Sequence, residues 1–198
     1  MIRFRAVAVF SLCVAFSAIG RSQQSSRPPD LPAADRTAVC KAILTSYMHG
    51  DKTRLNVSKV VFALGELDTN CSAGIIATPK SVKAYELSRT DLPDERFLLV
   101  DPTQQEKQVE INDPQHAIWG SADSPNLMPE EKMETAVQQA FDTGLFSVSE
   151  IAFDRTRTHA YAKYTFYCGM LCGHGLTVRL EKKAGVWKIT KHCGGFIS

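Results

Sequence analysis

The sequence lacks the short motifs that identify many hydrolases, nucleotide-binding proteins and metalloproteases. It contains no G-x-S-x-G nucleophile elbow, no glycine-rich phosphate loop, no H-E-x-x-H helix and no EF-hand loop. It also lacks a marked excess of charge: Arg3, Arg5 and Arg21 account for the small surplus of 23 basic over 21 acidic side chains. A basic nucleic-acid-binding surface is therefore not expected. The content of 44% hydrophobic and 22% charged residues is that of a globular protein.

Long hydrophobic runs are absent except at the N-terminus. Arg3 and Arg5 precede an apolar stretch of 14 residues at 6–19, and small residues follow it. This order is typical of a secretory signal, and the stretch is short for a bilayer span of ~20 residues. We predict a cleaved signal peptide over residues 1–22 and a flexible tether over 23–32. The mature protein, a single domain at 33–198, should be secreted or periplasmic and should have no membrane span.

The periodicity of apolar residues changes along the chain. It is helical in residues 33–49 and 130–143, and it alternates as in strands over 146–153 and 159–167. The middle of the chain, 88–129, is interrupted by Asp-Pro pairs and is expected to hold short strands and loops. The predicted fold class is α+β: an N-terminal helix and a second helix packed on an antiparallel β-meander formed by the C-terminal third.

Five of the six cysteines lie outside the predicted signal peptide: Cys40, Cys71, Cys168, Cys172 and Cys193. Uniform pairing outward from the predicted turn at Ala184-Gly185 brings Leu176 or Gly175 opposite Cys193, so the last three cysteines should meet at one edge of the sheet. Because a disulfide needs Cα atoms less than about 7 Å apart, Cys172–Cys193 and Cys168–Cys172 are better candidates than Cys168–Cys193. Cys40 and Cys71 are the expected second pair. The odd thiol should then belong to the C-terminal cluster.

This C-terminal cluster has two competing explanations. In the structural one, an oxidising compartment drives disulfide formation, and a bridge that closes ~20 residues contributes about 3 kcal/mol. In the functional one, the thiols and imidazoles form a soft site for copper(I) or zinc, with these ligands: Cys168, Cys172, His174, His192 and Cys193. Thiol–disulfide catalysis is disfavoured because the spacing is C-x3-C rather than C-x-x-C. We favour the structural explanation, because secreted cysteines usually pair.

Several segments of the C-terminal region carry a recognisable pattern: 146–154 (FSVSEIAFD), 168–175 (CGMLCGHG), 180–189 (LEKKAGVWKI) and 196–198 (FIS). The pattern resembles a group of small secreted bacterial proteins that end in C-G-x-L-C-G-x-G, L-x-K-x-x-G-x-W-x-I and W-I-S. Phe196 stands where that group has tryptophan. The resemblance implies a bacterial secreted origin, and because that group is uncharacterised it suggests no particular activity. The order of helix and meander is also similar to the α+β domains of nuclear transport factor 2, an analogy of fold that carries no function.

The predicted function is that of a secreted or periplasmic, disulfide-stabilised domain with a binding or envelope-associated role and no catalytic residues or cofactor. One alternative is a copper- or zinc-binding protein that uses the C-terminal cluster. A second is an enzyme with a pocket of the nuclear transport factor 2 type, for which the sequence offers no convincing residue set. The ligand and the partner are not identified by the sequence.

Overall fold

The computed structural model describes residues 33–48, 54–65, 71, 85–118 and 130–198. All of them belong to one structural unit, Leu31–Ser198. The predicted signal peptide and tether lie outside the described residues. None of the described helices has the length and apolar content that a bilayer crossing requires.

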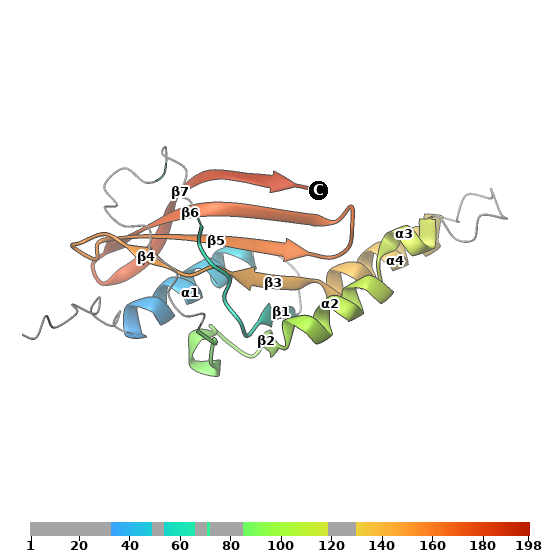
Figure 1. The fold of residues 1–198 in the computed structure, drawn as a ribbon, viewed down its shortest axis with the longest axis horizontal. Coiled ribbons are helices and arrows are strands. Elements are labelled where there is room, and N and C mark those ends of the chain that lie inside the picture. Colours follow the sequence, from blue (N-terminus) through green and yellow to red (C-terminus); the bar gives the residue numbers. More distant parts are fainter. Residues whose placement is uncertain (1–32, 49–53, 66–70, 72–84, 119–129) are drawn as a thin grey trace, which may run out of the picture. The chain divides into compact units, whose positions relative to one another are not determined.

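A mixed β-sheet is the centre of this unit (Figure 1). In chain order its strands are β1 (Leu55–Ser58), β2 (Phe97–Val100), β3 (Leu145–Val148), β4 (Ala152–Phe153), β5 (His159–Tyr167), β6 (Gly173–Lys183) and β7 (Val186–Ile197). In space the order is β2-β1-β3-β5-β6-β7, and β4 pairs with β5. β1 runs parallel to both β2 and β3, whereas β3, β5, β6 and β7 are antiparallel neighbours. The α+β class and the C-terminal antiparallel strands are confirmed, and the parallel pairs of β1 are an addition to the predicted architecture.

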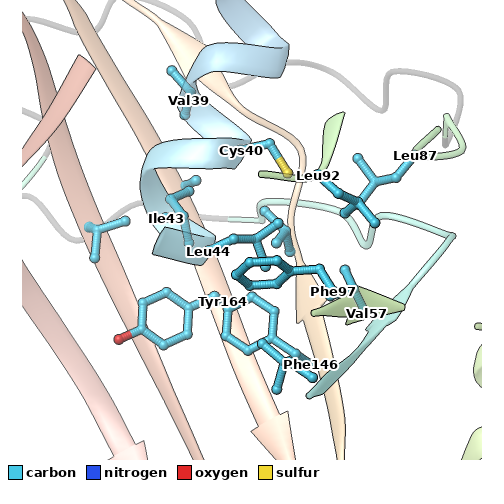
Figure 2. Close-up of a cluster of buried hydrophobic side chains, with 14 of the residues drawn as sticks. Val39, Cys40, Ile43, Leu44, Val57, Leu87, Leu92, Phe97, Phe146 and Tyr164 are labelled. Atoms are coloured by element: carbon cyan, nitrogen blue, oxygen red, sulfur yellow. The ribbon is translucent and has the colours of Figure 1, made fainter. Parts of the chain in front are cut away.

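Helix α1 (Ala33–Tyr47) covers one face of the sheet. Its buried residues lie at helical spacing on one side: Val39, Cys40, Ile43 and Leu44. Figure 2 shows this side of the helix against Phe97 of β2, Phe146 of β3 and Tyr164 of β5, which belong to the same hydrophobic core. Burying one such side chain contributes about 2 kcal/mol, so this contact stabilises the packing of α1 on the sheet.

The first turn of α1 is also tied to the β6–β7 hairpin by polar contacts. The carboxylate of Asp35 accepts hydrogen bonds from Lys182 Nζ at 2.6 Å and from Trp187 Nε1 at 3.0 Å. The bond from Lys182 is the main cause that holds the pKa of Asp35 below its ordinary value. This contact joins residues near the two ends of the described chain.

The expectation of short strands and loops at 88–129 is correct for β2 and wrong for residues 102–118, while its part at 119–129 lies outside the described residues. Residues 102–118 form helix α2 (Pro102–Ile111) and helix α3 (Pro114–Ile118), and a short 3-10 helix, η1, precedes β2 at Arg89–Asp91. The side chain of Asp101 caps α2 by accepting hydrogen bonds from two amides of its first turn. Within α2 only Val109 is buried, so this helix lacks the apolar stripe that reveals helices in a sequence.

Helix α4 (Glu130–Thr143) has the bounds that the sequence predicts. Its C-terminal end meets β1, where the Asn56 side-chain amide donates to the carbonyl oxygens of Asp142 and Gly144 at 3.1 and 3.3 Å. Because the last carbonyl groups of a helix have no partners within the helix, this amide completes the helix end.

The register of β6 and β7 changes twice along their length. Near the turn the pairing is uniform, with Lys182 opposite Trp187, but β7 then contains two additional residues, Thr190 and Cys193, at register shifts. As a result Leu176 lies opposite Gly195 rather than opposite Cys193. The two bulges therefore move Cys193 away from the loop that joins β5 to β6.

Alternation along β5 separates the two faces of the sheet. Ala160, Ala162, Tyr164 and Phe166 belong to the core beneath α1. Tyr161, Lys163 and Thr165 therefore point to the opposite side of the sheet, which we call the outer face. The candidate site lies there.

Candidate functional site

The described residues form two disulfides. Cys168 pairs with Cys172, with Cα atoms 5.0 Å apart, as the sequence favours. Cys71 pairs with Cys193, with Cα atoms 5.4 Å apart, across 122 residues of chain. Cys40 is a free thiol, and it is buried.

Three predictions about the cysteines are wrong. Cys172–Cys193, the alternative to Cys168–Cys172 in the expected convergence of the last three cysteines, is absent; the expected pair Cys40–Cys71 is absent too, and the odd thiol belongs to α1 rather than to the C-terminal cluster. The bulges in β7 account for the first error, because they place Cys193 near the middle of β6 while Cys172 stays at its start. The faces account for the second: Cys40 faces the core, whereas Cys71 and Cys193 are buried together with Tyr161 of the outer face.

The two histidines of the predicted metal site lie in different surroundings. His174 stacks on Tyr47, with ring centroids 5.6 Å apart, whereas His192 is an exposed residue of β7 opposite Val178. The three sulfurs of that site are held in two separate disulfides. Within the described residues, no three His, Cys, Asp or Glu side chains are placed to hold a metal ion. Copper or zinc binding stays a prediction for the reduced chain.

The free thiol of Cys40 lies in the core between α1 and the sheet. Burial raises the pKa of Cys40 to about 12, and the nearby carboxylate of Asp91 adds to this shift. A thiol with such a pKa is protonated at neutral pH and is a poor nucleophile. We therefore assign Cys40 to the packing of the core.

The Cys168–Cys172 ring is fixed to the α2–α3 connection by Asp113. This buried carboxylate accepts hydrogen bonds from the backbone amides of Met170, at 2.8 Å, and Gln115, at 2.9 Å. Gly169 has a φ of +129°, which favours glycine, and a side chain there would collide with the Asp113 carboxylate. The ring is thus a rigid end of the β5–β6 connection.

A groove of about 430 Å³ runs along the outer face over β5, β6 and β7. Its lining consists of aromatic, threonine and glycine residues with one lysine, together with parts of the sheet beneath: Phe62, Lys163, Tyr164, Thr165, Gly175, Leu176, Thr177, Cys193, Gly194, Gly195 and Phe196. The sequence does not predict this groove, because the lining residues come from four separate segments of the chain.

The glycines in the two strands give the groove its depth. A Cβ atom on Gly175 would lie 2.5 Å from a ring carbon of Phe196. The Phe196 ring therefore packs over Gly175, where any larger residue would collide with it. Gly194, beside the bulge at Cys193, has a φ of +139°, a conformation that side chains disfavour. The hydroxyl-bearing side chains of Thr165 and Thr177, both half-buried, lie on the same face.

Phe62 forms the other side of the groove and is held by the backbone. It follows β1, and its amide donates to the carbonyl oxygen of Val148 at 3.2 Å. Its own carbonyl oxygen accepts from the amide of Glu150 at 2.8 Å. Phe62 thus joins the sheet beside the end of β3.

The disulfide and a cluster of charged groups occupy the outer face beside the groove. Cys193 lines the groove, and its bridge to Cys71 is buried with Tyr161. Farther along, His159 Nδ1 lies 2.9 Å from Asp154 Oδ2. Burial raises the pKa of Asp154, but the hydrogen bonds from its neighbours outweigh burial and hold the pKa well below its ordinary value. This pair ties the β4–β5 turn to the start of β5.

The groove is an arrangement that can hold a ligand. It offers two aromatic rings, a glycine-lined base and threonine hydroxyls, all on a rigid sheet. A comparison of this chain with protein families, curated proteins and solved structures finds no match to any of them.

Proposed function

We propose that the protein is a secreted or periplasmic domain without catalytic activity that binds a ligand with an apolar group in the groove of the outer face. The observation that carries this proposal is the groove itself, where Phe62 and Phe196 flank a base of glycine and threonine. Pockets that bind small molecules or peptides are concave, mostly apolar and largely formed in advance, with a few polar groups to orient the ligand.

The chemistry of the lining indicates how such a ligand is held. An apolar group between two phenylalanine rings is removed from water, which contributes about 25 cal/mol for each Å² of apolar surface. The hydroxyls of Thr165 and Thr177 donate or accept hydrogen bonds with polar atoms of the ligand. Lys163 brings a positive charge to the lining. These groups supply affinity and orientation.

The disulfides support the proposed compartment. Disulfides form and persist in oxidising environments such as the extracellular space and the bacterial periplasm, and they are rare in the cytosol. The basic and then apolar start of the chain is the signal that directs a protein there. Expression of the full chain in a bacterium, followed by fractionation and mass spectrometry, should give a mature protein outside the cytosol that lacks about 20 N-terminal residues. An intact chain in the cytosol would contradict this part of the proposal.

The groove is tested with anilinonaphthalene sulfonate, an apolar anion that fluoresces on binding to apolar surface. We expect one dye molecule per chain. Phe196→Ala removes one aromatic side of the groove and should weaken binding about fivefold, since about 1 kcal/mol of apolar contact is lost.

Val186→Ala is the matched control. Val186 and Phe196 are both on β7 and are 55% and 56% exposed, so neither substitution disturbs the core. The control should leave dye binding unchanged. Equal binding by wild type and Phe196→Ala would show that the dye binds elsewhere and would remove the support for this groove.

A further inference from the structure

The last strand of the sheet has an edge that no described strand covers. β7 stands at the end of the strand order, with β6 as its partner. The amide of Ser198 donates to the carbonyl oxygen of Gly173 at 2.8 Å, so Ser198 faces β6. Because backbone groups alternate in direction along a strand, the amides and carbonyls of Ile197 and Gly195 face the free edge. Such unpaired groups are a template for another strand.

Protection of this edge is uneven along β7. Over residues 186–193 the two bulges and the charges of Lys188 and Lys191 discourage pairing, as they do on many edge strands. Residues 194–197 contain no bulge, charge or proline, and they keep one register with β6. Phe196 and Ile197 in this stretch are 56% and 91% exposed. Among the described residues, no strand pairs with this stretch of the edge, which lies beside the groove.

We propose that residues 194–197 of β7 accept an extended peptide of another protein as an additional strand, with one peptide side chain in the groove beside Phe196. The proposal rests on the function proposed above, because the groove supplies the side-chain pocket. In strand addition the main-chain hydrogen bonds provide affinity, and pockets for alternate side chains provide specificity. Every second side chain of the added strand lies on the outer face, level with Phe196.

The charge of β7 indicates which peptide fits. The strand carries Lys188, Lys191 and His192 and no acidic residue. A peptide that pairs with 194–197 and extends beyond this stretch comes near the positive charges of Lys188 and Lys191 without pairing with residues 186–193. The preferred peptide has apolar residues at alternate positions and an acidic residue beyond them. Opposite charges also raise the rate of association and exclude basic partners.

A second copy of this chain fits the same edge less well. Self-pairing through 194–197 engages four residues of each copy, compared with ~20–30 residues on each side of a standard stable interface. A peptide can bind through a smaller contact with β7, because it also places a side chain in the groove.

The probe is a capped heptapeptide in which valines alternate with threonines between two terminal glutamates. Its binding to the mature protein is measured by calorimetry and by amide hydrogen exchange in nuclear magnetic resonance. We expect slower exchange at Gly195 and Ile197, whose amides face the edge, and little change at Phe196. The same peptide with a fully N-methylated backbone keeps its side chains, loses its donors and should not bind.

Two variants separate the edge from the groove. Ile197→Pro removes one donor on the free edge and leaves the pairing with β6 intact, so peptide affinity should fall about fivefold while dye binding in the groove stays unchanged. Val186→Ala is the comparison at the other end of β7, where the peptide does not pair; it keeps its backbone N–H beside Lys183 of β6 and should leave peptide affinity unchanged.

The outcomes distinguish this proposal from the one on which it rests. Equal binding of the methylated peptide, or unchanged exchange at Gly195 and Ile197, refutes strand addition while retained dye binding leaves the groove in place. Loss of both dye and peptide binding in the wild type refutes the groove as well. Protection of these two amides in a peptide-free dimer, seen by sedimentation, would make a second copy the occupant and overturn the proposal.

Discussion

Removal of the Cys71–Cys193 bridge should destabilise the protein far more than removal of the Cys168–Cys172 bridge. The first spans 122 residues and the second spans 4. In the chain-entropy model the stabilisation grows with the logarithm of the loop length, which gives about 5 kcal/mol for the long loop and about 2 kcal/mol for the short one. The expected difference between two double variants is therefore about 3 kcal/mol.

The measurement is urea unfolding of Cys71→Ala/Cys193→Ala and Cys168→Ala/Cys172→Ala beside the wild type. Each double variant loses two sulfurs and one bridge, so each is the control for the other. A total stability of about 5–15 kcal/mol is usual for a domain, so the first variant should be close to unfolding. Equal losses, or a larger loss in the second variant, would refute the inference that Cys71–Cys193 closes the long loop.

Three further predictions concern groups that the fold uses for packing and polar contacts. Iodoacetamide should not label Cys40 in the native protein at about pH 8, because the thiol is buried and protonated. It should label Cys40 once the protein unfolds. Labelling before unfolding would contradict the assignment of Cys40 to the core. Asn56→Asp replaces the amide that caps α4 at Asp142 with an acceptor and should cost about 2 kcal/mol at neutral pH, whereas unchanged urea unfolding would show that the cap is unimportant. The lowered pKa of Asp35 beside Lys182 adds stability that is complete above its unfolded value of about 3.8 and is lost as the pH falls through the lower folded value. Thermal unfolding should thus show a steeper loss below about pH 4 in the wild type than in Asp35→Asn, and parallel curves would contradict this contact.

The sequence predicts those elements whose apolar pattern is local and strong. The bounds of α4 and of β5 match the predicted ranges 130–143 and 159–167, because each pattern extends over several turns or alternations. Helix α2 escaped prediction because its formation depends on the cap at Asp101 and on tertiary contacts rather than on an apolar stripe.

The cysteine pairing depends on information that is not local. Uniform extension of the β6–β7 hairpin places Cys193 opposite Leu176, and two bulges shift the true register by two residues. A bulge at Thr190 leaves no clear mark in the sequence, whereas the adjacent Gly194 and Gly195 are a typical signal of a bulge near Cys193. Those two glycines therefore indicate one of the two register shifts that determine the position of Cys193.

The groove also depends on contacts between residues that are distant in the sequence, so the sequence alone does not predict it. Phe62 and Phe196 lie far apart in the sequence, and they line one groove only because the fold brings the residues after β1 and the end of β7 to the same part of the sheet. The exposure of Phe196 and the glycine at 175 are each unremarkable alone. Their contact, in which the ring occupies the place of a side chain at 175, appears only once the strands are in register.

The central claim is that the mature chain is an oxidised domain whose Cys71–Cys193 bridge lies beside a preformed groove. Disulfide mapping tests it most directly: the unfolded but unreduced protein is alkylated, digested and analysed by mass spectrometry. We expect a Cys71–Cys193 linked peptide, a Cys168–Cys172 ring and alkylation of Cys40 alone. A Cys172–Cys193 or Cys40–Cys71 peptide, or alkylation of all five cysteines, would contradict it.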